Sequence, residues 1–552
     1  MKRIFALLLA VLMVTALVAS CTNNASPSTA PSTAPSTAPS QAPSEEPSDP
    51  APELGFPIVT DGSVTLEIWY AISADAAARV QDMADGKNFS WKKAMEDTGV
   101  KIKFEHPPQA NQNEIFQLMV TSQDYPDIIH PGVTLYTGGG DKGIDDEVFI
   151  DVKPLVDVYA PNYSRWINLS ETNRKWSVTD TGRMPGFAQV YDRVQAPFLG
   201  YGIRQDWLDD LGLARPETIA EWHDMLTMFK DEKTGGAAPM DLQQSGVPAS
   251  HFFVGAYGAS ATPYFIQKDG VVEFSAINDG FRSYLAQMAA WYDEGLIDPD
   301  YITNGGSGFM PVNARVANNQ SGATMMMYTF GGEALANMGV AEAGANFTFP
   351  KIPVLNKGDE LLVNFKSFEN VTPTSTAIST QCTVPEIAVR FIDYFYSDEG
   401  MITVNYGVEG ETFNITNGKY VHTDLIAKNP DGLTTTAAQQ IYLIHNGFMV
   451  FILDREEDAA SPTQLEYREN WGGMGKYVIT ANLTYTADEG QERSRILSDI
   501  NTRVEEFTNM VITGATALND ETWNAFVTQI EGMQLATAVA ITQAAFERYD
   551  KR

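Results

Sequence analysis

The sequence predicts an α/β fold, because short strands alternate with helical stretches in the first part of its globular region. Residues 64–68 alternate between polar and apolar side chains, a helical region closes at Gly99, and residues 100–104 alternate again. A helix over 114–122 and the largely apolar stretch 125–130 continue the series. Strand, helix, strand, helix, strand is the pattern of a parallel sheet with crossover helices.

Aromatic side chains stand where two of these predicted strands end. Trp69 and Tyr70 follow the first strand, and His130 ends the third. Ligands of parallel sheets bind beyond the carboxyl ends of the strands, so we expect these three residues to line a cleft. Packing in the hydrophobic core is the simpler role for each of them.

Residues 1–20 are predicted to be a signal peptide outside the fold. Lys2 and Arg3 precede an apolar run, Ile4 to Ala19, that is shorter than the ~20 residues of a membrane-spanning helix. The run ends in Val18-Ala-Ser-Cys21, which resembles a bacterial lipobox. The resemblance implies cleavage before Cys21 and lipid modification of its thiol; the alternative is a plain secretory signal with a chance cysteine.

Residues 21–56 are predicted to be an extended tether. They hold three copies of Pro-Ser-Thr-Ala, and such a composition cannot build a core. If Cys21 carries lipid, Cys382 has no partner for a disulfide within the chain. We therefore expect the exported fold to depend on its core, with Cys382 as a small buried side chain.

The globular part is strongly acidic. The chain has 37 basic and 70 acidic residues; cleavage removes Lys2 and Arg3 and no acid, so the mature net charge is −35. That field repels polyanions, which argues against nucleic acid and anionic lipid as partners. No phosphate-binding loop, zinc motif or nucleophile elbow is recognisable, so we expect no cofactor.

The stretch 196–233 is the pivot of the chain. Residues 198–203 form a predicted strand that contains Tyr201 and leads into Arg204, and a short helix follows over 206–211. Thr218 and Glu221 form a capping box that opens a second helix. Its apolar stripe is predicted to be Ile219, Trp222, Leu226 and Phe229. Further on we expect a turn between strands at 267–274, helices at 281–294 and 385–396, a strand at 321–328 and a helix-rich tail from about 488 to 550.

Taken in order, these segments resemble bacterial extracellular solute-binding proteins of ABC importers. The similarity is strongest to the large lipoprotein group tied to oligosaccharide uptake, which includes alginate-binding proteins. The segments that carry it are the lipobox at Cys21, YPDII at 125–129, VFIDVKPLVDVYAPNY at 148–163, IRQDWLDDLGL at 203–213, DEGLIDPDY at 293–301, FIDYFYSDEG at 391–400 and NYGVEGETFN at 405–414.

The resemblance implies a periplasmic-binding-protein-like fold of two α/β lobes, joined by hinge strands, with the ligand in the cleft between the lobes. Lobe I is expected at 57–195 plus about 358–405, and lobe II at 196–357 plus about 406–552. The cleft residues that we expect besides Trp69, Tyr70 and His130 are Tyr201, Arg204, Tyr257, Tyr328, Glu409 and Trp471.

The implied function is delivery of a carbohydrate, an oligosaccharide or related solute, to the permease subunits of an ABC transporter by cleft closure. The protein would be a lipid-anchored monomer on the outer face of the cell membrane, with no catalytic residues. Several relatives bind calcium after the Asp-Trp-Leu helix. Here Lys233 and Gly235 replace side-chain oxygens in the loop from Asp231, so we expect no metal.

Two other classes of function stay open. A secreted carbohydrate-active enzyme would need paired carboxylates, and with so many acidic residues such pairs arise anywhere by chance. A lipoprotein that binds peptides or feeds a sensor would share the export signal and the tether. Hydrolysis of a glycoside identifies the first class, and stabilisation by peptides identifies the second.

Overall fold

The computed structural model describes residues 54–72, 76, 86–242, 251–303, 314–364, 370–373, 375–444, 447–457, 460–473, 475–480 and 482–552. The predicted signal peptide, the lipidated Cys21 and the tether up to residue 53 lie outside the described residues. Within the described part of the chain, no helix is long and apolar enough to cross a membrane.

A four-stranded sheet, in the order β10-β3-β1-β2, organises the first part of the fold. β1 (Thr65–Tyr70) pairs in parallel with β2 (Lys101–Glu105) and with β3 (Ile128–His130), and β10 (Ala377–Ile378) joins β3 antiparallel. The predicted parallel sheet is therefore confirmed, with one late antiparallel strand added at its edge.

The helices predicted between these strands are also present. α3 (Phe89–Thr98) ends where Gly99 takes up a left-handed conformation with φ 71°. A Cβ on Gly99 would lie 1.7 Å from the Val59 carbonyl oxygen, so both the conformation and the close approach require glycine. The other helices of this part are α4 (Gln112–Ser122), α5 (Gly139–Asp145), α6 (Lys153–Tyr159), α7 (Pro161–Ile167), α8 (Glu171–Ser177), α15 (Pro385–Tyr394) and α16 (Asp398–Asn405).

A second sheet, in the order β8-β5-β9, organises the middle of the chain. β5 (Leu199–Arg204) lies between β8 (Ala323–Met327) and β9 (Phe347–Thr348), antiparallel to both, and all six of its residues are buried. Its glycines allow large side chains to cover it: a Cβ on Gly200 would lie 2.4 Å from the Trp471 ring. β6 (Phe265–Lys268) and β7 (Val271–Phe274) form the predicted hairpin.

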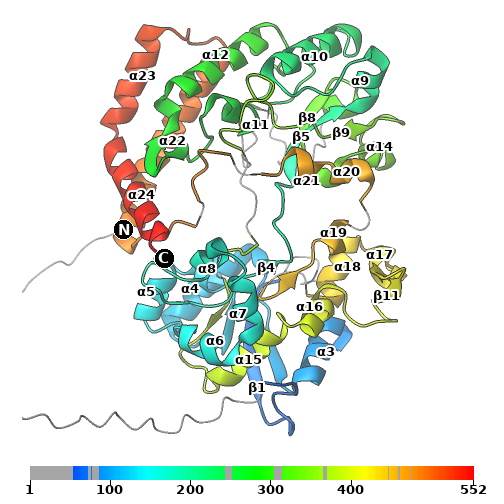
Figure 1. The fold of residues 1–552 in the computed structure, drawn as a ribbon, viewed down its shortest axis with the longest axis vertical. Coiled ribbons are helices and arrows are strands. Elements are labelled where there is room, and N and C mark those ends of the chain that lie inside the picture. Colours follow the sequence, from blue (N-terminus) through cyan, green and yellow to red (C-terminus); the bar gives the residue numbers. More distant parts are fainter. Residues whose placement is uncertain are drawn as a thin grey trace, which may run out of the picture. The chain divides into compact units, whose positions relative to one another are not determined.

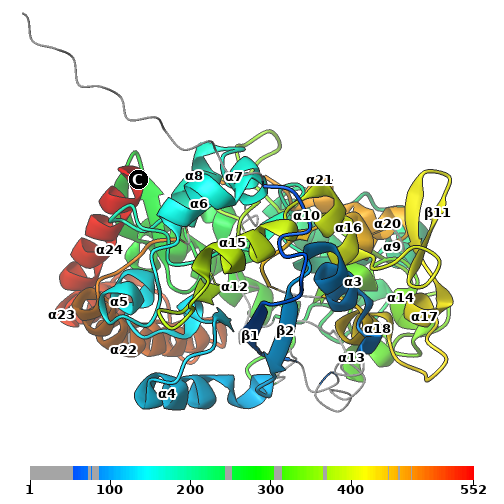
Figure 2. The same ribbon diagram turned by 90° about the horizontal axis from the view of Figure 1, so that it is seen from below.

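Amphipathic helices cover this second sheet. α10 (Ile219–Glu232) begins at the predicted capping box, in which Thr218 and Glu221 each accept the other's backbone N–H, and its predicted apolar stripe is buried. α22 (Ala487–Ile512), α23 (Asp520–Gly532) and α24 (Leu535–Asp550) form the predicted helical tail. α22 packs against α12 (Asp279–Asp293) and α24, and the three tail helices lie together in Figures 1 and 2.

The remaining elements are short. They are β4 (Val190–Tyr191), α9 (Gln205–Leu211), α11 (His251–Val254), α13 (Ala314–Ala317), α14 (Ala334–Asn337), β11 (Phe413–Thr416), β12 (Lys419–His422), α17 (Asp424–Ala427), α18 (Thr435–Tyr442), β13 (Val450–Phe451), α19 (Asp454–Glu457), α20 (Pro462–Leu465) and α21 (Tyr467–Asn470). Among the described residues there are also five turns of 3-10 helix: Gln109–Asn111, Val133–Leu135, Gly255–Tyr257, Ser275–Ile277 and Tyr328–Phe330.

Buried side chains form two large cores. The first core draws on residues between 66 and 190 and between 371 and 453. The second draws on 196–352, on Tyr467 and Trp471, and on residues 496–538. Ile444 to Leu453, which were expected in lobe II, contribute to the first core. The lobe boundaries expected from the sequence stay a prediction. Cys382 is free and buried, as expected, and burial raises the pKa of its thiol to about 12.

The chain passes between the two cores more than once. We call residues 192–196, which join β4 to β5, the first crossing segment. Residues 452–466, which join β13 to α21, are the second crossing segment, described here as far as 457 and from 460. β4 and β13 pair in parallel, so both segments leave the first core side by side.

We expect Gly200→Ala to destabilise the second core, because the added methyl group overlaps the Trp471 ring. Overpacking of this kind costs about 1–3 kcal/mol of unfolding free energy, measured by urea denaturation. Gly532→Ala is the matched control: a Cβ there meets nothing within 4 Å at the end of α23, so stability should hold or rise slightly. An equal effect at both positions would contradict this account of β5.

Candidate functional site

The carboxyl ends of β1 and β3 bring Tyr70 and His130 together. The two residues are register partners, and their rings stack with centroids 5.3 Å apart at an angle of 26°. Thr376 Oγ1 lies 2.8 Å from Nδ1 of His130, and Ser375 Oγ lies 3.3 Å from the same nitrogen. Hydroxyls on Nδ1 fix the orientation of the imidazole and leave Nε2 on the other side of the ring.

A later segment of the chain approaches these two rings. Gly447 has φ 126°, and a Cβ on it would lie 3.5 Å from Tyr70 Cε2 and 3.7 Å from His130 Nε2. The neighbouring Phe448 packs edge-on to His130, with centroids 6.4 Å apart. We call Tyr70, His130, Gly447 and Phe448 the aromatic ledge.

Trp69 does not join the aromatic ledge. Adjacent residues of a strand point to opposite faces of the sheet, so Trp69 and Tyr70 diverge. Trp69 is fully buried in a small separate core with Phe116 and Ile129.

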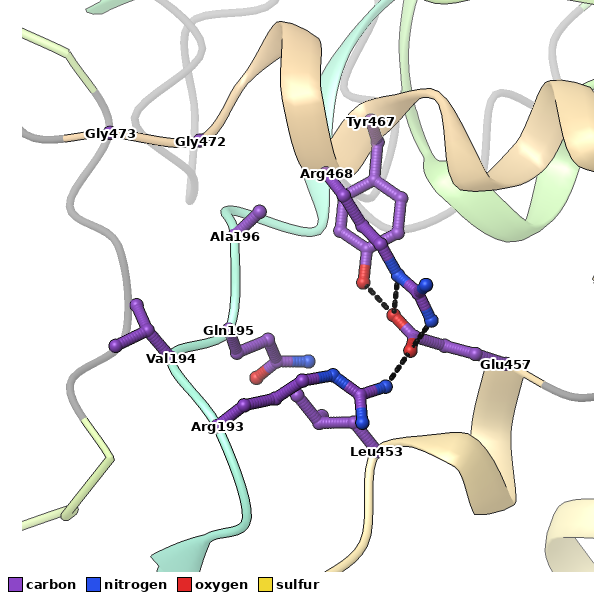
Figure 3. A pocket seen from close by; sticks show the side chains of 10 residues that line it. All are labelled: Arg193, Val194, Gln195, Ala196, Leu453, Glu457, Tyr467, Arg468, Gly472 and Gly473. Atoms are coloured by element: carbon purple, nitrogen blue, oxygen red, sulfur yellow. Dashed lines mark hydrogen bonds and ion pairs between the residues drawn. The ribbon is translucent and has the colours of Figure 1, made fainter.

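A pocket of about 190 Å³ lies between the two crossing segments. The first segment supplies Arg193, Val194, Gln195 and Ala196, and the second supplies Leu453 and Glu457; Tyr467, Arg468, Gly472 and Gly473 complete the lining. Figure 3 shows Arg193, Tyr467 and Arg468 all directed at the Glu457 carboxylate. The pocket thus combines planar hydrogen-bonding groups with a few small apolar side chains.

Tyr328, predicted as a cleft residue, packs directly behind this pocket. Its ring stacks on the pocket residue Tyr467 with centroids 4.2 Å apart at 18°. Burial raises the pKa of Tyr328 to about 12, so its phenol is neutral at physiological pH. Tyr328 therefore supports the orientation of Tyr467.

Tyr201 and Arg204 lie inside the second core. The Tyr201 hydroxyl donates to the Asp241 carbonyl oxygen at 3.1 Å. The Arg204 side chain is 1% exposed, and its guanidinium donates to Asp206, Asn319 and Glu342 at 2.6–3.0 Å. Packing and internal hydrogen bonds account for the position of both residues.

Trp471 is also fully buried. Its indole N–H donates to the Pro350 carbonyl oxygen at 3.1 Å, and its ring packs on Phe349 and Gly200. The two remaining predicted residues stand apart: Tyr257 is half-buried against Tyr284, and Glu409 is exposed in the turn before β11. The ligand-binding role of the predicted set stays a prediction.

No sequence motif marks Arg193, Gln195, Glu457 or Arg468 as site residues. The only local signal is the charged run Asp454-Arg-Glu-Glu457, which is unremarkable in a chain with 70 acidic residues. Their importance becomes visible only when β4 and β13 are known to pair.

In the loop from Asp231, where relatives are expected to hold calcium, Lys233 and the preceding Lys230 contact protein oxygen atoms. Lys233 Nζ lies 2.8 Å from Asp210 Oδ2, and Lys230 Nζ donates to the Glu294 carbonyl oxygen at 2.6 Å. Among the described residues, no group of three or more His, Cys, Asp or Glu side chains is placed to hold a metal ion. The expectation of no calcium at this loop stays a prediction.

Two α/β cores joined by paired crossing segments define the class of two-lobed binding proteins. The model of the family "Bacterial extracellular solute-binding protein" matches residues 67–402, more than half of the chain. The chain therefore belongs to this family, and the resemblance and the fold class expected from the sequence are confirmed.

Two curated relatives are similar over part of their length. The chain is 22% identical to Lipoprotein LipO of Bacillus subtilis over 345 residues, 60% of this chain and 66% of LipO. It is 25% identical to the fructooligosaccharide ABC transporter substrate-binding protein FusA of Streptococcus pneumoniae over 228 residues, 37% of this chain and 40% of FusA. The aligned regions thus span less than two thirds of either relative.

Solved structures support the fold over most of the chain. The alginate-binding protein AlgQ2 without calcium ion matches with a TM-score of 0.63 and 23% identity, covering 88% of this chain and 99% of AlgQ2. A solute-binding protein from Bifidobacterium longum infantis, described as HMO-binding and associated with an ABC transporter, has a TM-score of 0.70 and 16% identity. It covers 89% of this chain, and 99% of its own chain is matched.

We expect the free energy of unfolding of the protein to fall in mild acid because of His130 in the aromatic ledge. Burial lowers the pKa of His130 from 6.5 to about 4, so the native state keeps this imidazole neutral while the unfolded chain protonates it. The stabilising contribution is fully present above pH 6.5 and is lost as the pH falls towards 4.

His130→Gln removes this titration and leaves the other ionisable groups in place. The wild type should therefore lose more unfolding free energy than His130→Gln between pH 7 and pH 5, measured by urea denaturation at each pH. The same pH dependence in both proteins would show that His130 is not held neutral by burial.

Proposed function

We propose that the protein is a lipid-anchored solute-binding protein that delivers a carbohydrate to an ABC transporter on the outer face of the cell membrane. The observation that carries the proposal is membership of the extracellular solute-binding family over residues 67–402. The names of the relatives support a sugar as the solute: FusA is named for fructooligosaccharides and AlgQ2 for alginate.

The chemistry of the aromatic ledge and the pocket suits an oligosaccharide. Sugar rings present C–H faces that stack on aromatic side chains, and their hydroxyls pair with planar donors and acceptors. Tyr70 and His130 offer rings, and Gln195, Arg193 and Arg468 offer planar polar groups. Of the predicted cleft residues, we place Tyr70 and His130 in contact with the ligand and Tyr328 behind it.

The ligand that we propose is neutral or weakly charged. The mature net charge of −35 disfavours polyanionic sugars, and the two arginines of the pocket already pair with Glu457. Binding would draw the two lobes together around the solute, and the closed form would be the one that the permease recognises. We place the division between the lobes at the crossing segments.

Catalysis is not part of the proposal. The family consists of binding proteins, and the carboxylate that the pocket contains, Glu457, is occupied by two arginines and a tyrosine. A glycosidase needs one carboxyl group free to protonate the leaving group and a second one as base or nucleophile.

Calorimetric titration with a panel of neutral oligosaccharides tests the proposed function. We expect one class of glycan to bind, and Tyr70→Leu to weaken its binding by about 2 kcal/mol through the loss of ring stacking. Tyr264→Leu is the matched control, since Tyr264 is equally buried but lies in the second core. It should leave the affinity unchanged.

Two outcomes would contradict this proposal. Binding of peptides but of no glycan would identify a peptide-binding or sensor lipoprotein. Release of product from a chromogenic glycoside by the purified protein would identify an enzyme.

The anchor is tested separately through Cys21. Full-length protein expressed in a bacterial host should fractionate with the membrane, and Cys21→Ser should release it, because acyl chains contribute about 0.8 kcal/mol per buried CH₂. Cys382→Ser is the control and should stay with the membrane, since Cys382 is buried in the first core. Membrane retention of Cys21→Ser would disprove lipid anchoring at this residue.

A further inference from the structure

One buried carboxylate joins the two crossing segments. The Glu457 side chain is 3% exposed and accepts hydrogen bonds from Arg193, Tyr467 and Arg468. Arg193 belongs to the first crossing segment, whereas Glu457 belongs to the second and Arg468 follows it in α21. Figure 3 shows that these side chains meet at the edge of the pocket.

The contact between Arg193 and Glu457 is strong, but each of the two side chains also has other partners of opposite charge. A buried carboxylate is costly unless it is paired, and here two guanidiniums and a phenol satisfy it. Arg193 has further partners, however: its Nη1 lies 3.0 Å from Asp192 and its Nη2 lies 2.8 Å from Asp454. If the crossing segments separate, Arg193 loses Asp454 together with Glu457 but keeps Asp192. Glu457 keeps Arg468 and Tyr467, so the buried carboxylate is not left unpaired.

A contact with this property is suited to a hinge. Losing the only partner of a buried charge is strongly destabilising, and such a contact does not open in the folded state. The contact between Arg193 and Glu457 opens at lower cost, because each side chain retains other partners. Two arrangements of the crossing segments, one with this contact made and one with it broken, would then differ little in free energy.

We propose that Glu457 is a positioning residue that clamps the crossing segments together and sets the resting conformation of the hinge. The clamp extends the proposed function, because it regulates the closure that solute binding requires. It acts in the protein without ligand, so it is tested without knowledge of the sugar. The binding of a solute would then have to work with or against the clamp, which links occupancy of the pocket to the conformation of the hinge.

Distances between the two cores provide the test. Cysteines introduced by Val158→Cys in α6 and Met228→Cys in α10 lie at exposed positions, one beside each core. The full chain also carries Cys21→Ser and Cys382→Ala, so that only the introduced thiols take up nitroxide labels. Pulsed electron paramagnetic resonance then gives the distribution of distances between the labels.

We expect Glu457→Gln to change the ratio of conformers on the order of tenfold, seen as a shifted or a second distance population. The amide keeps the size of the side chain, but it removes the charge that both arginines share. Arg193→Lys replaces the planar guanidinium of the first crossing segment, which contacts Glu457. It should therefore shift the distance distribution in the same direction. The Arg193 side chain is 36% exposed and lysine keeps the positive charge, so we expect this variant to fold.

Asp241→Asn is the matched control. The Asp241 side chain is 8% exposed and pairs with Arg315 and Ser321, all within the part of the chain that builds the second core. It should lower the unfolding free energy and leave the distance distribution unchanged. Distributions of Glu457→Gln and Arg193→Lys that superimpose on that of the parent protein would overturn the clamp.

Failure of the proposed function has a different signature. If the protein binds no glycan but Glu457→Gln changes the distance distribution, the clamp is supported and the carbohydrate ligand is contradicted. If the protein binds a glycan but both variants leave the distance distribution unchanged, the proposed function is supported and the clamp is contradicted.

Discussion

The parallel pairing of β4 with β13 is the constraint on which the site depends. The Asp192 backbone N–H donates to the Phe451 carbonyl oxygen at 3.0 Å, and the Leu453 N–H donates to the Asp192 carboxylate at 3.1 Å. These bonds hold the starts of both crossing segments together although the segments are far apart in sequence. The pocket, and the meeting of Arg193 with Glu457, follow from that pairing.

The elements that the sequence predicts well are those that a few neighbouring residues decide. The end of α3 depends on the left-handed conformation of Gly99, and the start of α10 depends on the side chains of Thr218 and Glu221. Both signals lie within one helical turn of the boundary that they set. For the same reason the alternation of β1 and β2 and the stripe of α10 could be predicted without knowledge of the fold.

The candidate site was only partly predictable, because its residues are selected by contacts between distant segments. Tyr70 and His130 were identified by a rule about strand ends, and they meet because β1 and β3 pair. Arg204 drew attention as a lone cation after an apolar strand. Its partners Asn319 and Glu342 come from much later in the chain, and no local pattern reveals that they satisfy it inside the second core. Trp471 was likewise indistinguishable from an exposed ring until Gly200 was placed against it.

That contact between Gly200 and Trp471 has a mechanical consequence. The first crossing segment runs into β5, which carries Gly200, and the second runs through α21 into Trp471, so both segments end against one another in the second core. They also begin against one another, at β4 and β13. Two links that are joined at both ends resist torsion about their long axis much more than a single link does, while they still bend together. We therefore expect the two crossing segments to favour bending over twisting when the two cores move relative to one another.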